Sequence, residues 1–225
     1  MSTPPVKIAA IVPAFNEEET IGGVVRALAS SGLFSEVVVI SDGSTDRTAK
    51  EAKAAGATMV HELPRRGGKG KAMQHGITHT DSSIVFFCDA DLFGLTTPHL
   101  EAILAPVMRG ERVMNIGIRD RGALMMKISP HLPLIGGERA LYRHIIEAIP
   151  DKYLRGFMVE SALNYYCRIN KLPYGTSPMP GLKIRHKYQK VGCLRGIWQY
   201  FKMSWQSTKA ILTVRLAHLT GRFHV

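Results

Sequence analysis

Short apolar runs alternate with longer amphipathic stretches through the first half of the chain. The runs are rich in β-branched and aromatic residues, which is typical of buried parallel strands. The three predicted strands are residues 8–12, 37–40 and 84–88. The stretches between them begin with polar residues or glycine, as helices do. The three predicted helices are residues 17–29, 46–55 and 69–80. This alternation predicts an α/β fold, with an open, mostly parallel sheet and helices on both faces.

A polar cluster follows each predicted strand. The clusters are P-A-F-N-E-E-E at 13–19, S-D-G-S-T-D at 41–46 and D-A-D at 89–91. In such sheets the ligand crevice lies outside the carboxyl ends of the strands, so the three clusters converge on one edge. An alternative for the first two clusters is helix capping, because Asn16, Ser44 and Thr45 are good N-cap residues. Capping accounts for either of these two clusters taken singly, but the presence of all three clusters at one edge makes it a weaker explanation.

Asp89 and Asp91 lie where a buried strand is expected to end. Two carboxylates one residue apart repel each other unless positive charge lies beside them. Mg²⁺ or Mn²⁺ supplies that charge, takes one or two protein carboxylates and completes its shell with phosphate oxygens and water. The pair is therefore a candidate site for a metal-bound nucleoside diphosphate, although a solvated turn explains most D-x-D tripeptides taken alone.

The net charge of +11 is concentrated at the C-terminal end of the 225-residue chain. The last acidic residue is Glu160, and residues 161–225 carry eleven basic side chains and no acidic one. Such a segment predicts an anionic partner, which is a nucleic acid, a membrane surface or a phosphorylated substrate.

The rest of the composition narrows the class of protein. Apolar residues make up 45% of the chain, enough for a substantial core, and this excludes disorder as the main state. The apolar stretches are too short for a spanning helix, so we expect neither a membrane span nor a signal peptide. The three cysteines are odd in number and form no C-x-x-C pair, which favours a reduced, cytosolic protein.

An amphipathic pattern runs through the C-terminal segment. Its apolar residues recur at helical spacing on one face. They are Leu194, Ile197, Trp198, Phe201, Trp205, Leu212, Leu216 and Leu219. Arg195, Lys202 and Lys209 border this apolar stripe, a composition typical of a helix that lies in a membrane interface. A terminal helix packed on its own domain, or a dimer seam, is the alternative.

Four motifs in order resemble the signature of family 2 glycosyltransferases, which have the Rossmann-like GT-A fold. The motifs are V-P-A-F-N-E-E at 12–18, V-V-I-S-D-G-S-T-D-R-T at 38–48, R-G-G-K-G-K-A-M-Q-H-G at 66–76 and D-A-D at 89–91. The chain looks most similar to polyprenyl-phosphate (dolichyl-phosphate mannose synthase-like) glycosyltransferases and to glucosyl-3-phosphoglycerate synthases. The resemblance implies a GT-A domain at 1–190 and a basic amphipathic helical segment at 191–225. Within the domain, it implies a nucleotide-sugar half at 1–112 and an acceptor half at 113–190.

The resemblance also implies roles at the donor site. Glu17 is expected near the ribose and Asp42 at the base, although Ser41 replaces the first of two acids that the family usually has there. Asp91 is implied as the direct ligand of the Mg²⁺ or Mn²⁺ cofactor. The expected nucleotide-sugar-binding residues are Pro13, Ala14, Glu17, Asp42, Lys69, Asp89, Ala90 and Asp91.

Two further motifs resemble the acceptor half of the family. I-G-I-R at 116–119 and G-G-E-R-A-L at 136–141 imply that Arg119 and Arg139 hold the acceptor phosphate, a task suited to the planar guanidinium group. Either arginine could instead be a surface residue paired with Asp120 or Glu138.

G-F-M-V-E-S-A-L at 156–163 resembles the helix start that carries the family's acidic residue near the acceptor. Glu160 is thus a candidate catalytic base or orienting group. His186 matches a histidine that completes the metal site in phosphoglycerate-type relatives, with a solvated or phosphate-facing histidine as the alternative. The expected catalytic residues are Asp91, Arg139 and Glu160, and the expected metal ligands are Asp91 and His186.

Together these features predict a metal-dependent glycosyltransferase that moves a hexose from a UDP- or GDP-sugar to a phosphate-bearing acceptor. The main expectation is a polyprenyl phosphate, with the enzyme peripheral on the cytoplasmic face of the membrane through its C-terminal helix. The alternative is a soluble transferase that acts on a small phosphorylated acid such as 3-phosphoglycerate. A nucleotidyltransferase is a further alternative, but it would carry a glycine-rich loop with Lys or Arg after the first strand, whereas this chain has P-A-F-N-E there. No nucleic-acid partner is expected, because the aromatic residues of the C-terminal segment fall on the apolar stripe and do not alternate with exposed basic residues. A homodimer stays open.

Overall fold

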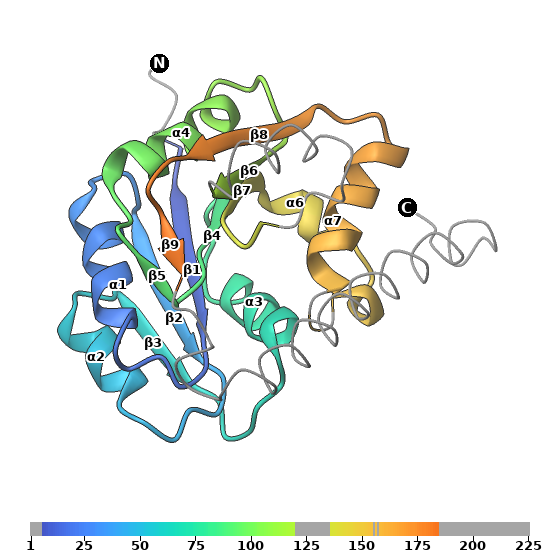
Figure 1. The fold of residues 1–225 in the computed structure, drawn as a ribbon. Helices are drawn as coiled ribbons and strands as arrows, with labels where there is room; N and C mark the ends of the chain where they lie inside the picture. The colour runs from blue at the N-terminus through green and yellow to red at the C-terminus, as the bar shows by residue number, and fades with distance from the viewer. Residues whose placement is uncertain (1–5, 120–135, 155, 157, 185–225) are drawn as a thin grey trace, which may run out of the picture.

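The computed structural model describes residues 6–119, 136–154, 156 and 158–184, and these form a seven-stranded sheet with helices on both faces (Figure 1). The elements in chain order are β1 (Ile8–Ala14), α1 (Ile21–Ser30), β2 (Glu36–Ser41), α2 (Thr48–Ala54), β3 (Met59–Glu62), α3 (Lys69–Ile77), β4 (Ile84–Phe87), β5 (Leu92–Phe93), α4 (Thr97–Met108), β6 (Met114–Arg119), β7 (Arg139–Tyr142), α6 (Arg143–Glu147), the 3₁₀ helix η2 (Asp151–Tyr153), α7 (Met158–Ile169), β8 (Tyr174–Met179) and β9 (Lys183–Ile184).

The strand order of the sheet is β3-β2-β1-β4-β7-β6-β8. β7 runs antiparallel to both of its neighbours, and the other pairings in this sheet are parallel. The chain passes from β1 to β2 on one side, and β4 lies on the other side of β1. Open α/β sheets bind their ligands beside such a reversal of direction, here at the carboxyl ends of β1, β2 and β4.

Alternate residues of the strands feed two separate hydrophobic layers. Ala10, Val12 and Phe86 pack with α1 and α4 on one face. Ile11 and Phe87 pack with α3, α6 and α7 on the other, and Figure 1 shows these two groups of helices on opposite sides of the sheet. A strand covered on both faces is apolar throughout, which is why β1, β2 and β4 could be recognised from the sequence. The predicted α/β architecture is confirmed.

The three predicted strands match β1, β2 and β4 to within two residues at each end. β3 was not predicted, because it lies at the edge of the sheet and its four residues are half-buried or exposed. Without a continuous apolar run, an edge strand of this length gives little sequence signal.

The predicted start of the first helix at residue 17 is wrong, because α1 begins at Ile21. Asn16 has a φ of 54°, in the left-handed region, and so breaks any helical run through it. The backbone N–H of Glu17 donates to Oγ1 of Thr48, and that of Glu18 to Oδ2 of Asp46. The N–H groups of Glu17 and Glu18 are thus bound by the neighbouring loop, and the carbonyl of Glu17 accepts from Thr20 and Ile21 in a turn that leads into α1.

The basic amphipathic segment predicted at 191–225 lies outside the described residues. Within the part of the chain that the structure describes, no helix combines the length and the apolar character that crossing a membrane requires.

Replacing Gly76 in α3 by alanine is expected to destabilise the protein. A β-carbon at this position would overlap Cγ2 of Ile11, a fully buried residue of β1. We expect the free energy of unfolding in urea to fall by about 1–3 kcal/mol, because the helix must move off the sheet.

Gly23→Ala is the matched control, since a β-carbon at Gly23 in α1 meets no atom within 4 Å. Alanine favours a helix interior over glycine by up to about 1 kcal/mol, so this variant is expected to be more stable than the wild type. Equal stabilisation by both substitutions would contradict the close packing of α3 on β1.

Candidate active site

The loops after β1 and β2 are joined by reciprocal hydrogen bonds. The Asn16 backbone N–H donates to Oγ of Ser44 at 3.1 Å, and the Thr45 backbone N–H donates to Oδ1 of Asn16 at 2.9 Å. These three side chains do not cap α1 or α2, whose N-cap residues are Thr20 and Arg47. The capping interpretation is therefore wrong, because the side chains of Asn16 and Ser44 each accept from the other loop instead.

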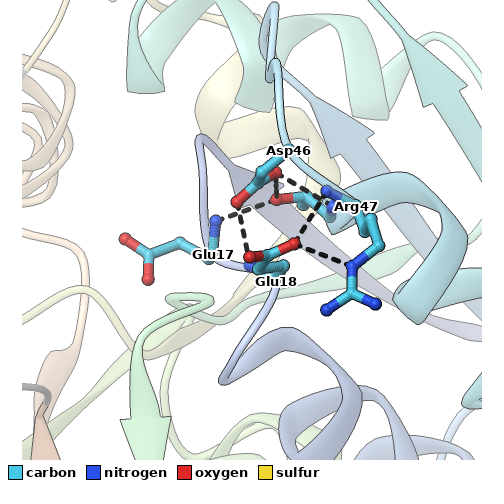
Figure 2. A network of polar contacts seen from close by, with 5 residues as sticks. Glu17, Glu18, Asp46 and Arg47 are labelled. Carbon is cyan, nitrogen blue, oxygen red and sulfur yellow. Dashed lines mark hydrogen bonds and ion pairs between the residues drawn. The ribbon is translucent and has the colours of Figure 1, made fainter.

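A second set of contacts extends this junction (Figure 2). Oε2 of Glu18 accepts from both the backbone N–H and the Nε of Arg47, each at 3.1 Å. Figure 2 shows the Glu17 carboxylate directed away from this network, and its Oε2 accepts from Oγ1 of Thr20 at 3.3 Å. The network fixes the backbone of both loops and leaves the Glu17 side chain outside it.

Asp42 connects the end of β2 to the glycine-rich loop. Its two carboxylate oxygens accept the backbone N–H groups of Gly67 and Gly68, each at 2.7 Å. Its own N–H donates to the carbonyl of Ala14, beside Pro13 at the end of β1. Asp42 thereby aligns the loop that leads into α3, and its predicted contact with a base stays a prediction.

Glycine is required next to Asp42 by the close approach of the two loops. Gly43 has a φ of 70°, and a β-carbon there would lie 2.6 Å from the backbone nitrogen of Arg66. Any side chain would push the glycine-rich loop away from β2.

Lys69, the first residue of α3, lies between two carboxylates from distant parts of the chain. Its Nζ is 2.6 Å from Oδ1 of Asp89 and 2.7 Å from Oε1 of Glu160 in α7. Burial opposes the charged ammonium, but the two carboxylates raise the pKa of Lys69 above its ordinary value. Burial likewise opposes the charge on Asp89, but Lys69 holds the pKa of that carboxyl below its usual range. Lys69 and Asp89 are therefore both charged at neutral pH.

Arg139 and Glu138 are buried at the start of β7. Arg139 is 0% exposed and donates from Nη2 to the carbonyl of Gly136 at 2.6 Å. Oε2 of Glu138 lies 3.7 Å from Nε of Arg119, at the end of β6. Burial, reinforced by the nearby charge of Asp89, raises the pKa of Glu138 to about 7. Arg119 does pair with Glu138, but neither arginine is the surface residue that the alternative interpretation supposed.

Glu138 is a site residue that the sequence analysis did not select. Its place in the sequence could have indicated it, because Glu138 lies inside the motif G-G-E-R-A-L, directly before the apolar residues of a buried strand. Gly137 beside it backs directly onto the Asp89 carboxylate, and a β-carbon there would overlap that group. The motif G-G-E-R-A-L is thus packed against Asp89, the first residue of D-A-D.

Asp91 is half-buried in the turn between β4 and β5, after the buried Ala90. β5 pairs antiparallel with β9, so that Leu92 lies opposite Ile184. His186 lies outside the described residues. The pairing nevertheless brings the described chain to a point two residues before His186, directly beside the residue that follows Asp91.

The structure thus brings most of the predicted residues to one edge of the sheet. Donor-side residues lie at the ends of β1, β2 and β4, and Lys69 links them to Glu160 in the predicted acceptor half. Arg119 and Arg139 approach from β6 and β7. A carboxylate turn next to buried guanidinium groups is able to bind a metal-bound diphosphate and a second anion side by side.

The model of glycosyl transferase family 2 matches residues 9–165. The chain belongs to this family. The match covers the loops, the D-A-D turn, β7 and the first half of α7 that form the site.

Curated relatives are similar over much of the chain. A glucosyl-3-phosphoglycerate synthase of Mycolicibacterium paratuberculosis is 30% identical over 193 residues, which cover 69% of this chain and 58% of that protein. The synthase of Mycolicibacterium smegmatis is 28% identical over 190 residues, covering 69% and 62%. This chain therefore spans about three fifths of the length of these relatives.

Solved structures of the synthase from Mycobacterium tuberculosis have the same fold. The complex with Mn²⁺, UDP and glucosyl-3-phosphoglycerate superposes with a TM-score of 0.76 at 26% identity, covering 93% of this chain and 80% of that chain. A complex of the same enzyme with Mg²⁺ and UDP gives the same TM-score of 0.76, at 25% identity, and covers 93% and 79%. The GT-A fold expected from the sequence is confirmed.

Replacing Lys69 by methionine is expected to lower the free energy of unfolding by about 3 kcal/mol at pH 7–8, because two carboxylates lose their shared cation. Lys69 holds the pKa of Asp89 low, so this pKa rises in the folded variant, and the loss shrinks as the pH falls and Asp89 takes up a proton. Urea denaturation at several pH values measures this.

Lys71→Met is the control, since Lys71 lies two residues further along α3 with an exposed side chain. It is expected to change stability by less than about 0.5 kcal/mol at every pH. A Lys69→Met loss that is small, or that does not depend on pH, would show that the three charges are not coupled.

Proposed function

We propose that this chain transfers glucose from UDP-glucose to a small phosphorylated acid of the 3-phosphoglycerate class. The observation that carries the proposal is that Gly137 packs against Asp89 of the D-A-D turn, while Glu138 beside it lies next to Arg119. This supports a site for a diphosphate next to a site for a second anion. The relatives at 30% and 28% identity are glucosyl-3-phosphoglycerate synthases, which supports this substrate class.

The donor set at the turn suits a hard divalent cation. We assign the ligand role to Asp91, which is half-buried in the turn after β4, with His186 as the second ligand. The antiparallel pairing of β5 with β9 supports the second assignment. A bound Mg²⁺ or Mn²⁺ would neutralise the diphosphate leaving group. Family structures with UDP contain Mn²⁺ or Mg²⁺.

The acceptor phosphate is assigned to Arg119. Its side chain is 15% exposed, and within the described part of the chain its buried Nη1 has no hydrogen-bond partner. A buried, unsatisfied guanidinium N–H favours an anionic ligand. With the pKa of Glu138 raised to about 7, a large share of this carboxyl is protonated at neutral pH and does not repel a phosphate.

Arg139 and Glu160 have supporting roles in this proposal. Arg139 is 0% exposed, so it contributes positive charge behind Asp89 and Glu160. Glu160 is 3% exposed and holds Lys69. If an ionised phosphate oxygen of the acceptor attacks the sugar, no base is needed. If a hydroxyl group attacks, Glu160 would have to accept its proton, and the ion pair between Glu160 and Lys69 would first have to break.

The polyprenyl phosphate of the first expectation is the second candidate. The observation in its favour is the acid-free segment at 161–225, which would suit an anionic lipid. The similar proteins named above favour the small acceptor. Membrane attachment, the cytoplasmic location and a homodimer stay predictions.

The test is transfer of radiolabelled glucose from UDP-glucose in the presence of Mn²⁺, with 3-phosphoglycerate and with undecaprenyl phosphate in vesicles as separate acceptors. We expect a labelled water-soluble product that depends on 3-phosphoglycerate. Label that appears only in the lipid phase would replace the proposed acceptor with the second candidate, and no transfer to either would overturn both.

Asp91→Ala is expected to lower kcat by about 100-fold or more, because the leaving group loses the charge that stabilises it. Asp81→Ala is the matched control, since this exposed aspartate lies before the opposite end of the same strand, β4. Full Mn²⁺-dependent activity of Asp91→Ala would contradict the proposed metal site.

A further inference from the structure

Three histidines meet at the end of α3 that is remote from Lys69. His61 belongs to β3, His75 lies in the last turns of α3, and His79 follows that helix. One ring nitrogen from each lies within 4.8 Å of the other two. The Nε2 atoms of His75 and His79 are 3.1 Å apart. The cluster has no place in the proposed transfer reaction.

The arrangement follows from the fold. Residues four apart on a helical turn lie on the same face, which brings His75 and His79 together. β3 is the edge strand of the sheet and lies next to β2, on which α3 packs; the ring of His61 stacks on that of His79 with centroids 3.8 Å apart. All three side chains are half-buried, so they remain accessible to a small ion.

Each of the three rings offers one imidazole nitrogen to a shared ion. A neutral imidazole has a lone pair available at neutral pH, and imidazole nitrogen is the donor that Zn²⁺ and similar transition metals take most readily. Mg²⁺ and Mn²⁺ prefer oxygen donors, which separates this cluster from the aspartate turn.

We propose that His61, His75 and His79 form a binding site for a transition-metal ion of the Zn²⁺ class. Two nitrogens bound to one tetrahedral Zn²⁺ at about 2.0–2.1 Å lie about 3.3 Å apart, close to the 3.1 Å between His75 and His79. His61 reaches the same ion by turning out of its stack. Water takes the fourth position.

The ion would fasten the edge strand β3 to α3. His79 lies ten residues beyond Lys69 in sequence, roughly 15 Å along a helix. The site is therefore separate from the transfer site and acts on stability. Because the ion binds the folded chain, it raises the melting temperature.

The experiment is calorimetric titration of the full, tag-free, chelator-treated chain with Zn²⁺ and, separately, with Mg²⁺. We expect about one equivalent of Zn²⁺ to bind at the cluster and to raise the melting temperature by several degrees, and the same concentration of Mg²⁺ to do neither. The double variant His75→Ala/His79→Ala is expected to bind Zn²⁺ at least about tenfold more weakly. His144→Ala, an exposed histidine of α6, is the matched control and is expected to bind like the wild type.

Two further measurements keep the proposal testable if the double variant folds poorly. Co²⁺ added to the wild type is expected to give the intense visible bands of tetrahedral coordination, in place of the weak bands of the hydrated ion. Asp91→Ala is expected to retain the Zn²⁺ affinity, which separates this site from the proposed donor metal. Equal Zn²⁺ affinity in the double variant and the wild type, or a Co²⁺ spectrum like that of the hydrated ion, would overturn the proposal.

Discussion

A lysine shared by two carboxylates joins segments of this molecule that lie far apart in the sequence. Lys69 opens α3 on the donor side and reaches both Asp89, after β4, and Glu160, in α7. Either carboxylate would be costly to place there alone, since Glu160 is 3% exposed and Asp89 has a side-chain exposure of 21%. The ammonium group offsets both charges, and so α7 and the D-A-D turn are held against the same helix end.

Other contacts place that lysine. Asp42 fixes the backbone of Gly67 and Gly68, the two residues before Lys69. At Gly70 a β-carbon would overlap the carbonyl of Leu154, so α3 lies directly against the segment that follows η2. Gly70 is therefore required by close packing of backbone against backbone, whereas Gly68 is favoured by its φ of 89°. As a result, the N-terminal end of α3 borders both the proposed donor site and the proposed acceptor site.

The features that could be predicted from the sequence depend on residues that are close together along the chain. β1, β2 and β4 are buried on both faces and apolar throughout, and the order of the motifs was enough for the family. The role of Asn16 was not predictable, because a good capping residue is also a good donor and acceptor for a neighbouring loop. Lys69 and Glu160 are 91 residues apart, and His61 is recruited to His75 and His79 by an edge strand with no apolar signal. Such pairings depend on the sheet order, which a pattern along one chain does not contain.

The most direct measurement of this joining role is amide hydrogen exchange in the wild type and in Lys69→Met under native conditions. If Lys69 holds α7 and the D-A-D turn against α3, exchange becomes faster in α7 and in residues 66–68 of the variant. The central strand β1, and α1 on the opposite face of the sheet from α3 and α7, keep their protection. Unchanged protection of α7 would contradict the role given to Lys69, and so would a uniform loss of protection across the sheet.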